Sequence, residues 1–74
     1  MTLEAVGMKE ITRIFEITDG LGIHRESLVI PLGTGAGRVR KLPSGKLEIT
    51  VDASTPFEEW LAGLPALVRA AQGA

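Results

Sequence analysis

The sequence of 74 residues contains no cysteine, no tyrosine and a single histidine, His24. The absence of cysteine excludes disulfide bonds and every zinc or iron–sulfur site that uses a thiolate ligand. One histidine leaves only metal sites built from carboxylates, and no group of Asp and Glu residues has the spacing of a calcium-binding loop. We therefore expect the protein to hold no metal ion and no other cofactor.

Long apolar runs and a strong charge of one sign are also missing. No stretch approaches the roughly 20 apolar residues that cross a bilayer, and the first residues lack the basic-then-apolar order of a signal peptide. The sequence therefore predicts a cytoplasmic protein with no membrane partner. The formal net charge is −1, so no long-range field attracts the whole chain to nucleic acid, and none is expected as a partner.

Apolar residues, by contrast, are abundant. They make up 45% of the chain, and its mean hydropathy is +0.22. The length predicts one domain, residues 1–74, and a domain of this size buries only about 60% of the surface that its unfolded chain exposes. The apolar excess therefore indicates either a rich core or apolar surface that contacts a partner. Without disulfides or metals, self-association is a natural source of additional stability.

Residues 3–18 are expected to form an N-terminal helix with Thr2 as its N-cap and Gly20 as its left-handed C-terminal residue. One stripe at helical spacing is apolar or small: Leu3, Gly7, Ile11, Ile14, Phe15 and Thr18. An extra strand over residues 11–18 is the alternative, because five of those eight residues are β-branched and such residues favour strands.

A small antiparallel sheet of three strands is expected to follow. The first strand is the short apolar run 27–31, which ends at a proline, and a glycine-rich loop connects it to a β-hairpin over residues 37–52. Pro43-Ser44-Gly45 forms the hairpin loop, with Gly45 supplying a positive φ. The expected register places Val39 opposite Ile49 and Arg40 opposite Glu48, which gives the hairpin one apolar and one charged face.

The C-terminal segment is expected to be a broken helix. Thr55 and Glu58 have the spacing of a capping box, and Pro65 interrupts the helical pattern because proline removes an internal hydrogen bond. The expected fold class is therefore α+β: an N-terminal helix, a three-stranded antiparallel sheet with a hairpin, and a broken C-terminal helix.

Candidate catalytic groups are few, and each has a simpler interpretation. His24 lies near Glu26 and Ser27, but neighbours in sequence seldom form a triad. Glu58 and Glu59 are adjacent on a helix, where side chains point about 100° apart and do not share a site. We therefore expect a protein that is not an enzyme.

The leading function prediction is a non-enzymatic module for protein interaction or self-association, either a homo-oligomer or the small partner in a complex. The residues expected to form its interaction surface are on the C-terminal segment: Trp60, Leu64 and Leu67. Large aromatic and apolar anchors are typical of such surfaces.

The alternative prediction is a small regulatory domain that binds an anion, phosphate or another ligand. Backbone N–H groups of glycine-rich loops can bind phosphate, and basic side chains follow this loop directly. The candidate residues are Gly33, Gly35, Gly37, Arg38 and Arg40. A strand rather than a helix is expected after the loop, which departs from the nucleotide-binding motifs and disfavours this alternative.

Overall fold

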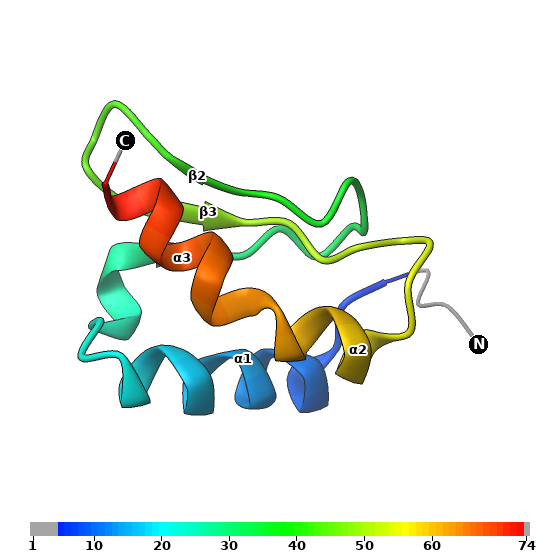
Figure 1. The fold of residues 1–74 in the computed structure, drawn as a ribbon. Coiled ribbons are helices and arrows are strands. Elements are labelled where there is room, and N and C mark those ends of the chain that lie inside the picture. The colour runs from blue at the N-terminus through cyan, green and yellow to red at the C-terminus, as the bar shows by residue number, and fades with distance from the viewer. Residues whose placement is uncertain (1–4, 74) are drawn as a thin grey trace.

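The computed structural model describes residues 5–73, which form three helices packed against one sheet (Figure 1). The elements are α1 (Met8–Gly20), the 3₁₀ turn η1 (Arg25–Ser27), β1 (Leu28–Val29), β2 (Val39–Lys41), β3 (Leu47–Ile49), α2 (Phe57–Ala62) and α3 (Leu64–Gln72). The α+β class expected from the sequence is confirmed. No helix within residues 5–73 is long and apolar enough to cross a membrane.

Residues 11–18 are helical, so the helix prediction is correct and the alternative strand is wrong. The helix begins later than expected, because Val6 lies before it and donates its N–H to the Leu32 carbonyl at 2.7 Å. Gly7 is the N-cap, and its N–H donates to a Glu10 carboxylate oxygen at 2.9 Å. The Thr2 cap that the sequence predicted lies outside the described residues.

The end of α1 also differs from the prediction. The positive φ belongs to Gly22, at +77°, and not to Gly20. Gly22 donates its N–H to the Asp19 carbonyl, and Ile23 donates to the Thr18 carbonyl, both at 3.0 Å. This pair of bonds is a Schellman motif, so the helix end was predicted correctly in kind but two residues too early.

The sheet has the order β1-β3-β2, and it is mixed rather than purely antiparallel. β1 pairs with β3 in parallel, whereas β2 pairs with β3 in antiparallel fashion. The prediction of three antiparallel strands is therefore wrong for β1. Residues 30–38 lead from β1, on one side of β3, to β2 on the other side. The hairpin then reverses the chain direction, so β3 runs opposite to β2 and in the same direction as β1.

The hairpin has the predicted register. Val39 faces Ile49 and Arg40 faces Glu48, and Gly45 has the expected positive φ of +91°. Opposite residues share a face of the sheet, and Leu47 and Ile49 are buried. The face with Val39 and Lys41 is therefore the one that α3 covers, and Arg40 and Glu48 lie on the other face.

The core lies between this face of the sheet and the helices. Its buried apolar residues come from every part of the described chain: Val6, Ile14, Leu47, Ile49, Val51, Trp60, Leu61, Leu64, Val68 and Ala71. The C-terminal helix is broken as predicted, with α2 ending at Ala62 and α3 beginning at Leu64, next to Pro65. α3 contacts β2, β3 and both other helices, so it is the central element of the helical layer.

The start of α2 corrects one further prediction. The helix begins at Phe57 with Pro56 as its N-cap, and no side chain caps it. Thr55 instead donates its hydroxyl to an Asp52 carboxylate oxygen at 3.3 Å. The capping box predicted at Thr55 and Glu58 is therefore absent, because Asp52 binds the residues that precede the helix.

Candidate functional site at the edge of β2

The three residues predicted to form an interaction surface separate into two environments. Trp60 is 7% exposed and Leu64 is fully buried, so both belong to the core. Leu67, on α3, is 37% exposed. Met8 and Leu32 are more exposed still, but they lie on other parts of the chain. Of the predicted surface, Leu67 is the side chain available to a partner.

Trp60 has a structural contact that explains its burial. Its indole N–H donates to the Gly37 carbonyl at 3.1 Å, and its ring packs at a tilt against Phe57 with 5.9 Å between ring centroids. A buried indole is normally found with such a hydrogen-bond partner. The residue therefore joins α2 to the loop that precedes β2.

The glycine-rich loop is held against the segment after β3, which occupies some of the groups that an anion would need. Gly35 donates its N–H to the Val51 carbonyl at 2.7 Å and accepts from Ala53 at 2.9 Å. At Gly37 a Cβ atom would lie 2.8 Å from the Asp52 carboxylate, so this side chain is packed directly against the loop.

Asp52 is the residue that organises this region. Its carboxylate accepts hydrogen bonds from the backbone N–H groups of Ser54 and Thr55, at 2.7 and 3.2 Å, and from both of their hydroxyl groups. The N–H of Ser54 is the main cause of a pKa below the ordinary value for this carboxyl. An ionised carboxylate beside Gly37 repels a second anion.

The two arginines of the predicted anion site do not converge on the loop. Arg40 donates to a Glu48 carboxylate oxygen at 2.8 Å across the hairpin. Arg38 is exposed and takes part in none of the ion pairs formed within residues 5–73. The structure thus places Gly37 and Asp52 together, whereas Arg40 is bound elsewhere.

The outer edge of β2 presents backbone groups with no strand beside them. Thr50 donates its N–H to the Arg38 carbonyl, and Leu42 donates to the Lys46 carbonyl. Hydrogen-bonded pairs alternate along an antiparallel ladder, so Arg40 also bonds toward β3, whereas the N–H and C=O groups of Val39 and Lys41 point away from it. In the part of the chain that the structure describes, no other strand pairs with this side of β2.

A shallow apolar groove of about 640 Å³ adjoins this edge. It lies between β2 with its following turn and the second half of α3, and it is lined by Val39, Arg40, Lys41, Leu42, Pro43, Leu67, Ala70 and Ala71. Ala70 is small and exposed, so it leaves room for another chain to approach the helix. An unpaired strand edge beside an apolar surface is a template for pairing with a further strand.

The surroundings of this edge are basic. Residues 23–52 contain five basic and three acidic residues, a net charge of +2, although the whole chain has a charge of −1. Arg38, Lys41 and Lys46 are exposed, and none of them belongs to the ion pairs seen between described residues. These three positive charges are therefore available to a partner.

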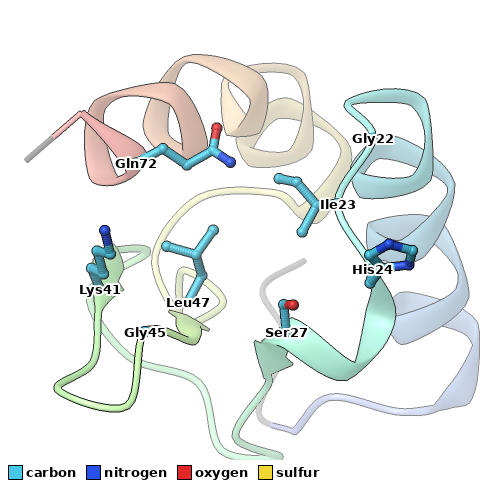
Figure 2. A pocket seen from close by; sticks show the side chains of 8 residues that line it. All are labelled: Gly22, Ile23, His24, Ser27, Lys41, Gly45, Leu47 and Gln72. Carbon is cyan, nitrogen blue, oxygen red and sulfur yellow. The ribbon is translucent and has the colours of Figure 1, made fainter.

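A second pocket, of about 340 Å³, brings together His24 and Ser27, the candidate catalytic pair in the sequence (Figure 2). Ser27 donates its backbone N–H to the His24 carbonyl at 2.9 Å, but no hydrogen bond joins the two side chains among the described residues. Figure 2 shows Ile23 and Leu47 directed into the middle of the pocket, with His24 and Lys41 at opposite sides. A nucleophile activated by a base requires such a side-chain bond.

Glu58 and Glu59 likewise do not form a pair of carboxylates. Glu58 accepts a hydrogen bond of 2.8 Å from Arg13 on α1, and this bond is the main cause of its lowered pKa. Within residues 5–73, no group of three or more Asp, Glu or His side chains is placed to hold a metal ion.

Comparisons of the chain with protein-family models, with curated proteins and with solved structures give no match. The candidate site therefore depends on geometry alone. Sequence reasoning missed the free edge of β2, because the order of strands in a sheet is not visible in the hairpin pattern. It also missed Asp52, although an Asp followed two residues later by Ser is a turn signal that could have revealed it.

Proposed function

We propose that the protein is a non-enzymatic module for protein interaction and that its contact surface is the outer edge of β2 with the adjoining groove. The observation that carries this proposal is the position of the outward backbone groups of Val39 and Lys41 beside the apolar side chains of Leu67 and Ala70. Backbone hydrogen bonds supply affinity in strand pairing, and neighbouring side-chain pockets supply specificity.

The partner in this proposal is a protein chain, either a second copy or another small protein. No cofactor is needed, because the contact consists of hydrogen bonds and apolar packing. The anion-binding alternative has no comparable support, since the Asp52 carboxylate lies against the glycine-rich loop and Arg40 is bound to Glu48.

Photo-cross-linking in cells of the source organism tests this proposal. A benzophenone amino acid replaces Leu67 at the groove in one variant and Lys9, an exposed residue of α1, in the control variant. We expect a discrete adduct from the probe at position 67 and none from the probe at position 9. Mass spectrometry of the adduct identifies it as the chain itself or as another protein.

The cross-linking result has clear contrary outcomes. No adduct from position 67, or the same adducts from both positions, would contradict the proposal. Light scattering of the unmodified chain at about 100 μM, well above the sub-micromolar dissociation constants of stable dimers, tests separately whether the sequence-based expectation of self-association is correct.

A further inference from the structure

We infer that the edge of β2 binds an extended, acidic segment of a partner protein, which adds to the sheet as a fourth strand. This inference rests on the proposed function and specifies the chemistry of the partner. Three properties of the surface support it: the outward backbone groups, the difference between the two faces of β2, and the excess of positive charge.

The backbone groups suit an extended chain. Val39 and Lys41 each direct one N–H and one C=O away from β3, because the hydrogen-bonded pairs of the hairpin fall at Arg38, Arg40 and Leu42. An added strand satisfies such groups with its own alternating donors and acceptors.

The two faces of β2 define a pattern for the added strand. Residues opposite Val39 and Lys41 would lie on the face that α3 covers, next to Leu67 and Ala70 in the groove. Residues opposite Arg40 would lie on the other face, because side chains alternate along a strand. The fitting segment therefore alternates apolar residues, which enter the groove, with acidic residues, which lie on the face of Arg38, an exposed arginine that takes part in none of the ion pairs between described residues.

Charge distinguishes this partner from a second copy of the chain. Two copies pairing through β2 about a two-fold axis at Val39, Arg40 or Lys41 would place like charges opposite each other in every case: Arg38 with Arg40, Arg40 with Arg40, or Lys41 with Lys41. Like charges directly opposite each other destabilise a strand pair. An acidic segment instead brings opposite charges to this face, beside Arg38, which is exposed.

The position of the few aromatic residues argues against a nucleic acid as the partner. The chain has two phenylalanines, one tryptophan and no tyrosine, and all three aromatic residues are in helices, with Trp60 buried. The edge of β2 therefore lacks the stacking surface on which single-stranded nucleic acids bind.

A synthetic heptapeptide of alternating glutamate and valine, capped at both ends, is the probe for the test. We expect it to slow the hydrogen exchange of the Val39 and Lys41 amides by at least about tenfold and to bind with a dissociation constant below about 1 mM. Binding should weaken at high salt, because the contacts involve exposed charges.

Two control peptides separate strand addition from other modes of binding. One has N-methyl groups on the peptide bonds that would face β2, so that it cannot donate hydrogen bonds to the edge. The other has lysine in place of every glutamate. We expect neither to slow the exchange of these two amides, and equal binding of either peptide would overturn the inference.

Protein variants identify the charges that matter. Arg38→Gln should weaken binding of the acidic peptide severalfold, whereas Arg25→Gln, which removes an arginine bound to Asp19 on another surface, should leave it unchanged. Arg38 is exposed, and its side chain forms none of the ion pairs of the described chain. Equal loss of binding in both variants would contradict the role of Arg38.

The outcomes also separate this inference from the proposed function. If the acidic peptide has no effect while the probe at position 67 still forms an adduct, the inference is wrong and the interaction module stands. If the Val39 and Lys41 amides become protected with rising protein concentration alone, a second copy occupies the edge and the acidic partner is wrong. Absence of both the peptide effect and the adduct would overturn both proposals.

Discussion

Trp60 on α2 donates its indole N–H to the carbonyl of Gly37, across 3.1 Å, two residues before β2 begins. This bond links the helical layer to the point at which the edge strand starts. Gly37 has a φ of +68° and lies against Asp52, so the backbone reaches the tryptophan only in a conformation that glycine adopts readily. The position of the β2 edge thus depends on Gly37.

Gly37→Ala should destabilise the protein by at least about 1–2 kcal/mol, because a left-handed backbone is costly for any residue with a Cβ atom. The added methyl group would also lie 2.8 Å from the Asp52 carboxylate. Gly33→Ala is the matched control, since nothing lies within 4 Å of a Cβ atom there and its φ is not positive.

Denaturant unfolding followed by circular dichroism measures both glycine variants. We expect Gly33→Ala to change the free energy of unfolding by less than about 0.5 kcal/mol, as at an unstrained surface position. Equal effects of the two substitutions would show that neither the backbone conformation nor the contact with Asp52 matters at position 37.

Thr55→Ala should change the free energy of unfolding by less than about 0.5 kcal/mol. A true N-cap threonine would contribute roughly 1 kcal/mol, but Thr55 does not cap α2, and its hydroxyl makes only a long bond to Asp52. Chemical denaturation of the variant measures the difference. A loss near the value of a true cap would restore the capping box that the sequence predicted.

Protonation of the Asp52 carboxylate should make the protein less stable in acid. Because hydrogen bonds led by the Ser54 N–H lower the pKa of this carboxyl below 3.8 in the folded chain, folding favours its ionised form. Its contribution is complete above the unfolded value and is lost as the pH falls through the lower folded pKa. Asp19 and Glu58, whose pKa values are lowered by Arg25 and Arg13, act in the same direction.

Asp52→Asn should therefore lower the thermal midpoint at neutral pH and reduce its further decrease between about pH 5 and pH 2. Glu26→Gln, a change at an exposed residue of η1, serves as the control and should keep the pH profile of the parent chain. A carboxyl titration of Asp52 by NMR with a midpoint at or above 3.8 would contradict the assignment.

Ile49→Ala should cost about 2–5 kcal/mol, because Ile49 is fully buried at the centre of the sheet and the substitution leaves a cavity. Glu48→Ala should cost less than about 1 kcal/mol, since it removes one partly exposed ion pair with Arg40 and such pairs contribute little. Urea unfolding of the two variants gives the comparison, and the reverse order would mean that the register is shifted by one residue.

The parts of the fold that were predicted correctly depend on local patterns. The hairpin register follows from the loop around Gly45 and from the alternation that ends at Ile49, both of which are visible in a few neighbouring residues. The break at Pro65 follows from a missing N–H. Such features need no knowledge of what lies elsewhere in the chain.

The parts that were not predicted depend on contacts between distant segments. Val6 lies outside α1 and bonds to Leu32, and no local pattern indicates that pairing. Trp60 and Leu64 were assigned to a surface because their residue types suit an interface, but they pack in the core instead. For the same reason, only the assembled sheet shows that Val39 and Lys41 have an open side.

The parallel pairing of β1 with β3 has a consequence for the order of folding. The paired residues of β2 and β3 are separated along the chain only by the short loop before Lys46. Leu28 and Leu47, by contrast, are separated along the chain by the long loop after β1, by β2 and by the hairpin loop. Local closures are fast, and distant ones carry a larger entropic cost. β1 should therefore join the sheet after the rate-limiting step, so that Val29→Ala accelerates unfolding and leaves the refolding rate nearly unchanged.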